Sequence, residues 1–213
     1  MKLAIFGATG TVGGALLEQS LKDGHTVQAL ARTPSKVQIQ HPQLLVVPGD
    51  VADRAAVAQT IAGCEAVLTC LGGTNRRNPE VIQAGTAAIM AAMRAEKITR
   101  LIVMQGFHLP FPGDPRNPGR AVIRAILRVI NKNLLTDSLA MAHAVQQSNL
   151  DWTVVRAPRV FNGPPTNACR TGQLKLGPWN RVSNGDVAQL MLRCLQDRDS
   201  IHDAPMISTS APK

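Results

Sequence analysis

The sequence predicts one doubly wound α/β domain, in which helices cover both faces of a mainly parallel sheet of about six or seven strands. Short apolar runs alternate with helical segments along the chain of 213 residues, which is typical of repeated strand–helix–strand units. A glycine-rich turn follows the first apolar run, where such folds place a phosphate-binding loop. The length suits a single domain over residues 1–213.

The glycine-rich turn directly follows the first strand, which we expect over residues 2–6. The turn reads Gly7-Ala8-Thr9-Gly10-Thr11-Val12-Gly13 and leads into a helix. Gly7 permits a tight turn, Gly10 lets the backbone approach a pyrophosphate, and Gly13 lets the helix pack against the strand. The helix N-terminus offers N–H groups to an anion, so we expect a nicotinamide dinucleotide. The spacing G-x-x-G-x-x-G differs from the common G-x-G-x-x-G, and the alternative is a turn without a ligand.

The residues after the second strand, expected over 26–31, determine which dinucleotide fits. An acidic side chain there binds the ribose 2′-hydroxyl of NAD, whereas a cation accommodates the 2′-phosphate of NADP. The chain has Arg32 and Lys36 at this place, and no carboxylate occurs between residues 24 and 49. Arginine offers phosphate a bidentate fork and lysine a point charge, so we expect a preference for NADPH. The alternative is that both cations are solvated loop residues.

Two more strands, expected over 44–47 and 66–71, bring their carboxyl ends to the same edge of the sheet. Asp50 and Val51 follow the first of them, where a polar and an apolar side chain could hold an adenine ring. Asp50 could instead cap a turn. Gly72-Gly73 follows the second strand, and its small residues allow the backbone close to the middle of the cofactor.

The chemistry is expected beside the end of the fifth strand, over 101–104, which borders the nicotinamide in such a sheet. A Tyr-x-x-x-Lys pair exchanges the proton in many reductases, and the absence of tyrosine excludes that mechanism here. The candidate proton donors are His108, His143 or solvent, while Gln105 could orient a substrate by hydrogen bonds. His108 could equally be a polar surface residue. A flavin or an extended tetrapyrrole takes its proton from water, so the protein need supply only orientation.

A cationic helix is expected over 120–132, after a proline-rich loop at 109–119. Its cations recur every fourth residue: Arg120, Arg124, Arg128 and Lys132. This pattern predicts an amphipathic helix with a cationic stripe and a wide apolar face. The stripe could serve as a lid, contact an anionic membrane or a partner, or be a solvated face of a packed helix. A second helix is expected from Asp137, whose side chain could cap it, to Ser148.

The sixth strand lies within Leu150-Asp151-Trp152-Thr153-Val154-Val155-Arg156-Ala157-Pro158. Together with the glycine-rich turn and a helix start at 182–188, this stretch resembles the atypical short-chain dehydrogenase/reductase family, which includes biliverdin-IXβ reductase/flavin reductase and many bacterial NAD(P)H-binding proteins. The resemblance extends over essentially the whole chain. It implies a Rossmann domain in which these residues hold the dinucleotide: Gly7, Thr9, Gly10, Thr11, Val12, Gly13, Arg32, Lys36, Asp50, Val51, Leu71, Gly72 and Gly73.

The chain departs from that reductase pattern at the expected substrate pocket. Gln105-Gly106 stands where the pattern has Thr-Ser, and Arg159 stands where it has a histidine. A small substrate-facing cap is expected from residues 107–136 and 159–182, with these candidate substrate contacts: Phe107, Arg159 and Phe161. Further arginines could suit a phosphate or carboxylate of the substrate, or be ordinary surface residues: Arg76, Arg77 and Arg170.

The function expected from these residues is an NADPH-dependent reductase. It would pass hydride from the nicotinamide to a planar acceptor, such as a flavin, a quinone or a biliverdin-like tetrapyrrole. The alternative is a redox-silent protein that senses NADPH and regulates a partner. The Gln105-Gly106 pair and the cationic helix favour that alternative.

The composition indicates which classes of partner and which cellular compartment to expect. The net charge of +9 suits a phosphate-rich cofactor or an acidic substrate. Aromatic residues make up 3% of the chain, too few for the base-stacking surfaces of single-strand nucleic-acid binders. The four cysteines fit no zinc spacing, so we expect reduced thiols and no metal site. No leader or membrane-length apolar run is visible, so we expect a cytoplasmic protein.

Overall fold

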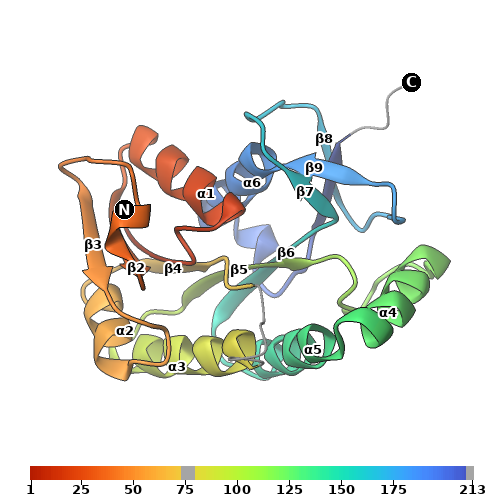
Figure 1. The fold of residues 1–213 in the computed structure, drawn as a ribbon, viewed down its shortest axis with the longest axis horizontal. Helices are drawn as coiled ribbons and strands as arrows, with labels where there is room; N and C mark the ends of the chain where they lie inside the picture. The colour runs from red at the N-terminus through yellow and green to blue at the C-terminus, as the bar shows by residue number, and fades with distance from the viewer. Residues whose placement is uncertain (73–79, 210–213) are drawn as a thin grey trace.

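The computed structural model describes residues 1–72 and 80–209, and within them the main sheet has eight strands. Their order is β3-β2-β1-β4-β5-β6-β10-β8; β8 is antiparallel to β10, and the other neighbours are parallel (Figure 1). The strands are β1 Lys2–Phe6, β2 Thr26–Ala31, β3 Leu44–Pro48, β4 Ala66–Thr69, β5 Arg100–Gly106, β6 Asp151–Ala157, β8 Cys169–Gly172 and β10 Met206–Thr209. Two short strands, β7 Arg159–Phe161 and β9 Arg181–Ser183, pair in parallel with each other.

The predicted doubly wound fold is confirmed. The chain runs outward from β1 through β2 to β3, and then returns to place β4 on the other side of β1. This reversal of strand order is the position at which open α/β sheets hold their ligands. The predicted strand number was too low, because Cys169–Gly172 lacks the apolar alternation of a strand and joins the sheet edge through β10.

Helices cover both faces of this sheet. In chain order they are α1 Thr11–Lys22, α2 Arg54–Ile61, α3 Val81–Ala95, α4 Pro118–Ile130, α5 Lys132–Gln146 and α6 Asn184–Gln196, with short 3₁₀ turns η1 Pro34–Lys36 and η2 Arg198–Ser200. Helices α1 and α6 lie on one face and α2, α3 and α5 on the other, while α4 extends beyond α5 at the end of the molecule (Figure 1). Each face buries its own apolar cluster against the strands.

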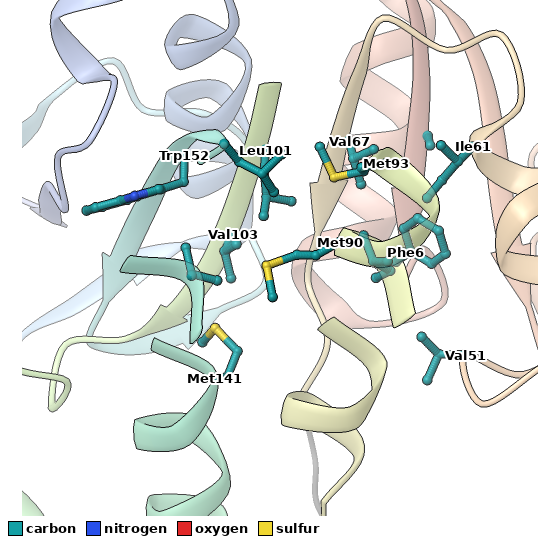
Figure 2. Close-up of a cluster of buried hydrophobic side chains, with 14 of the residues drawn as sticks. Phe6, Val51, Ile61, Val67, Met90, Met93, Leu101, Val103, Met141 and Trp152 are labelled. Atoms are coloured by element: carbon teal, nitrogen blue, oxygen red, sulfur yellow. The ribbon is translucent and has the colours of Figure 1, made fainter. Parts of the chain in front are cut away.

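The larger apolar cluster fills the space between the strands and helices α2, α3 and α5 (Figure 2). Met90 and Met93 reach it from α3 and Met141 from α5. Phe6 and Val51 belong to the same cluster, and both also line the cleft described below. Part of the cleft wall is therefore formed by side chains of the packed core, and this packing holds the wall rigid.

The helix expected to begin at Asp137 begins at Lys132 instead, because Asn131 caps it by accepting a hydrogen bond from the Leu134 N–H at 3.0 Å. Asp137 is buried in the middle of α5 and faces the start of α3. Its carboxylate accepts hydrogen bonds from the N–H groups of Ile82 at 2.9 Å and Gln83 at 2.8 Å. The aspartate is thus a helix cap, but of a neighbouring helix.

A buried ion-pair network fastens the segment after β5 to β6. Arg156 is fully buried, and its guanidinium donates two hydrogen bonds to the Asp114 carboxylate, at 2.7 and 2.8 Å. Arg156 also donates to the Leu109 carbonyl at 2.8 Å. Burial alone would raise the pKa of Asp114, but hydrogen bonds from Arg156 and the Phe111 N–H outweigh it and hold that pKa below its ordinary value.

Arg120 also binds Asp114 and is buried, which corrects the prediction that it belongs to a solvent-facing cationic stripe. Arg124 is half-buried, whereas Arg128 and Lys132 are exposed. At the first turn of α4, Arg120 therefore points toward the protein, because Asp114 supplies a buried counter-charge that the helix pattern alone does not reveal.

Candidate functional site

A cleft of about 210 Å³ opens where the carboxyl ends of β1, β2 and β4 meet. Most of the predicted cofactor contacts contribute to its wall. The lining residues are Phe6, Gly7, Thr9, Gly10, Leu30, Ala31, Arg32, Gly49, Asp50, Val51, Cys70, Leu71, Gly72 and Val81. The structure thus brings residues from four separate loops to the point where the strand order reverses.

Two of the three glycines of the first turn, Gly7 and Gly13, occupy positions that exclude a side chain. Gly7 has a φ of +82°, and a Cβ there would lie 2.7 Å from the Cys70 carbonyl oxygen. A Cβ on Gly13 would lie 2.0 Å from the Gly7 carbonyl oxygen, so α1 packs directly on the turn. Gly10 begins α1 without a side-chain cap. The N–H groups of the first turn, from Thr11 to Gly13, have no intrahelical acceptor and suit an anion.

The end of β2 presents Arg32 to the cleft. Its side chain is 72% exposed, and its Nε lies 3.8 Å from Oδ2 of Asp50. The other Asp50 oxygen accepts a hydrogen bond from the Ala52 N–H at 2.9 Å, so Asp50 both caps a turn and lines the cleft. Lys36 is exposed at the end of η1, outside the cleft wall. Of the two predicted cations, Arg32 is the one at the cleft itself.

Leu71 and Gly72 line the cleft after β4, and a Cβ on Gly72 would have no heavy atom within 4 Å. The predicted contact Gly73 lies outside the described residues, as do Arg76 and Arg77. Gln105 is buried and its side-chain N–H₂ lies 3.5 Å from the Leu71 carbonyl, to which it donates. Gln105 therefore holds the loop after β4 in place from the neighbouring strand.

His108 is buried beyond the end of β5, and its Nε2 has no hydrogen-bond partner among the described residues. Its ring lies against Gly106, where a Cβ would stand 2.4 Å from Nδ1. Burial, with a smaller effect of the Arg124 charge, lowers the pKa of His108 to about 4. The imidazole is neutral at pH 7 and is a poor acid there. His143 is exposed on α5 and does not line the cleft.

The three predicted substrate contacts divide into a buried and an exposed group. Phe107 packs with Leu176 and Met206 in a small apolar cluster, so packing accounts for its ring. Arg159 and Phe161 are exposed on β7.

The β7–β9 pairing adds a residue that the sequence did not single out. Arg181 lies beside Arg159 across the β7–β9 pair, and its guanidinium stands 5.4 Å from the centre of the Phe161 ring. Asn184 ties this region to the phosphate turn, since its side chain donates to the Thr11 carbonyl at 2.9 Å and accepts from the Gly163 N–H at 2.9 Å. Arg181 is brought beside Arg159 by pairing of residues 22 positions apart, and no local motif marks it.

The fold and the cleft define a dinucleotide-binding protein of the Rossmann type. The family model described as NAD(P)H-binding matches residues 7–198, so the chain belongs to that family. The uncharacterized protein YwnB of Bacillus subtilis is 27% identical over 184 residues, which span 86% of this chain and 83% of that protein.

Solved structures share the fold over almost the whole chain. A short-chain dehydrogenase/reductase from Veillonella parvula, in complex with NADP, has a TM-score of 0.79 at 16% identity and covers 99% of this chain and 95% of its own. ChuY, an anaerobillin reductase from Escherichia coli O157:H7, has a TM-score of 0.80 at 18% identity, with coverage of 100% and 99%. The predicted fold is therefore that of NAD(P)-dependent oxidoreductases.

Proposed function

We propose that the protein is an NADPH-dependent reductase that transfers hydride to a planar acceptor, such as a flavin, a quinone or a biliverdin-like tetrapyrrole. The observation that carries the choice of NADPH is the guanidinium of Arg32 at the ribose end of the cleft. The Asp50 carboxylate faces that guanidinium at 3.8 Å, so a bound 2′-phosphate would share Arg32 with it. The anaerobillin reductase and the NADP complex among the structures with the same fold support the proposal.

The lining of the cleft suits the phosphates and the adenosine of a dinucleotide. No side chain fits at Gly7 or Gly13, where the turn packs against neighbouring backbone, and the N–H groups that follow suit a phosphate. The first turn of α1 would hold the pyrophosphate, Val51 and Asp50 the adenine, and Leu71 and Gly72 the nicotinamide half. NADPH supplies the hydride when it is bound. The chain's part is to bind the dinucleotide and to orient the acceptor against its nicotinamide.

The proton donor in this proposal is solvent. The chain has no tyrosine, and His108 is neutral at pH 7 with a pKa of about 4. Gln105 is engaged with the Leu71 carbonyl, and an amide exchanges no proton at this pH. An acceptor whose reduced form takes a proton from water suits such a site, which is why a planar conjugated acceptor is proposed over a carbonyl compound.

The positive surface on β7 and β9 fits the acidic group of such an acceptor. Arg159 and Arg181 lie side by side, and the Phe161 ring beneath Arg181 offers a flat apolar surface. A carboxylate or phosphate on the acceptor would bind the two guanidinium groups. Asn184 connects this surface to the start of α1, so acceptor and cofactor would meet at the same end of the sheet.

Replacing Arg32 tests the cofactor choice. We expect Arg32→Gln to lose about 1.5–3 kcal/mol of NADPH binding, or about 10- to 100-fold in Kd, with NADH binding unchanged. Arg54→Gln is the control, because Arg54 is an exposed cation on α2 outside the cleft wall. The measurement is titration of both dinucleotides with each variant. Equal losses for NADPH and NADH, or a loss in the control, would contradict the assignment.

A further inference from the structure

Helix α4 turns an apolar face to the solvent. Its exposed large apolar side chains recur at helical spacing on one face, and they are Val122, Ile126, Val129 and Ile130. Val129 is 85% and Ile130 72% exposed. A helix that only packs on its own domain turns such side chains inward, so this face gains free energy when something covers it.

Nothing in the described part of the chain covers this face. Helix α4 lies at the end of the molecule, beyond α5 and away from α1, α2 and α3 (Figure 1). Its inward side is already used, because Arg120 is buried against Asp114 and Ile123 packs on the cluster of Phe107. The apolar face is therefore available to a partner outside the domain.

Exposed cations flank the apolar face, and this stretch of the sequence carries no carboxylate. Arg116, Arg128 and Lys132 are exposed before, on and after α4. No carboxylate occurs in the chain from residue 115 to residue 136. The partner that complements this face therefore carries negative charge beside an apolar surface.

An exposed tryptophan stands near the start of the same helix. Trp179 is 93% exposed, in a loop that Asn117 fastens to α4 by donating to the Leu176 carbonyl at 2.7 Å. Tryptophan together with an apolar face and flanking cations is the composition of helices that lie in the interface of a bilayer.

A second copy of the chain does not suit this face. A helix of this length is about 20 Å long and about 10 Å wide, so its outer face falls far short of the ~800 Å² per partner of a standard interface. Two copies joined here would also bring their cations together without a carboxylate between them.

We propose that α4 docks the protein on an anionic lipid surface. Val122, Ile126, Val129 and Ile130 would enter the boundary between headgroups and acyl chains, and the exposed cations would contact lipid phosphates. In this proposal the helix lies on the membrane surface. None of the helices in the described residues is long and apolar enough to cross a membrane. This inference concerns a face outside the dinucleotide cleft and does not depend on the proposed reaction.

Vesicle sedimentation tests the proposal. We expect the full chain to bind phosphatidylcholine vesicles that contain phosphatidylglycerol, and to bind pure phosphatidylcholine at least about tenfold more weakly. Ile126→Ser with Val129→Ser should weaken binding about tenfold or more, because it removes buried apolar area. Arg128→Gln with Lys132→Gln should weaken it about 25-fold, at about fivefold for each cation. All four side chains are exposed, so the variants should melt like the wild type.

Matched controls distinguish docking through α4 from nonspecific binding through net charge or exposed apolar side chains. Leu45→Ser removes an exposed apolar side chain on β3, and Arg54→Gln with Arg198→Gln removes two exposed cations elsewhere. We expect both to bind vesicles like the wild type. Equal losses in the controls, or no vesicle binding by the wild type, would overturn the proposal. A wild-type dimer in solution that Ile126→Ser with Val129→Ser turns into a monomer would also overturn it, and would assign the face to a second copy.

Discussion

Replacing Gly13 by alanine disrupts the candidate phosphate site without removing a polar side chain. The added Cβ would lie 2.0 Å from the Gly7 carbonyl oxygen and 2.6 Å from its carbon, whereas real Cβ contacts essentially never fall under 3.0 Å. The turn and α1 must therefore separate by about 1 Å. Both contacts are with backbone atoms, so no side chain can rotate away.

A displacement of about 1 Å in a positioned site costs on the order of 100-fold in reaction rate, and we expect Gly13→Ala to weaken NADPH binding by a similar factor, because the phosphate-binding N–H groups move with the turn. The adjacent Gly14→Ala is the control. Its Cβ would lie 3.6 Å from the Ala8 carbonyl oxygen, which is ordinary contact. We expect it to leave binding unchanged and to stabilise the fold by about 1 kcal/mol through helix propensity.

Dinucleotide titration, with thermal unfolding of each variant, measures this difference. Unfolding is needed because Gly13→Ala also strains the fold, and binding is compared only at temperatures where each variant is folded. The reasoning is refuted if Gly13→Ala binds NADPH as tightly as Gly14→Ala does. It is equally refuted if Gly14→Ala, which meets no close atom, weakens binding as much as Gly13→Ala.

Two further predictions concern buried ionisable groups. Asp114→Asn leaves the fully buried Arg156 without its counter-charge and should destabilise the fold by about 3–5 kcal/mol in chemical denaturation, whereas the exposed pair of Glu18 with Lys22 is worth less than about 1 kcal/mol. Folding lowers the pKa of Asp114. The carboxylate therefore contributes its full stabilisation at every pH above its ordinary pKa of about 3.9, and loses it as the pH falls through the lower pKa of the folded state. The difference in unfolding free energy between wild type and Asp114→Asn should shrink only in that acidic range. His108→Gln should leave the pH profile of turnover unchanged between about pH 6 and 8, because a group with a pKa of about 4 does not titrate there; a titration that disappears in the variant would return His108 to the chemistry.

The parts of the fold that the sequence predicted depend on neighbours in the chain. The glycine turn, the end of β2 with Arg32, and the strands before them are encoded within about ten residues each, and local pattern suffices for such elements. Parallel strands then bring their ends together without further information. For this reason most of the cleft wall was predictable from the sequence.

The parts that escaped prediction depend on contacts between distant residues. Asp137 is a residue type that caps helices, but it caps α3, where it accepts a hydrogen bond from the Ile82 N–H, 55 residues earlier in the chain. Arg156 resembles an ordinary strand arginine until the fold brings Asp114 against it across 42 residues. The inward position of Arg120 follows from the same carboxylate, so the orientation of α4 could be found only with the tertiary structure.

The most direct test of the central claim is the oxidation of NADPH by the purified protein, offered FMN, a quinone and a biliverdin in turn, with NADH measured alongside. The proposal predicts that at least one acceptor is reduced as NADPH is consumed, at a rate proportional to protein and faster than with NADH. Tight binding of NADPH with no acceptor reduced would contradict a reductase and would instead support a protein that senses NADPH.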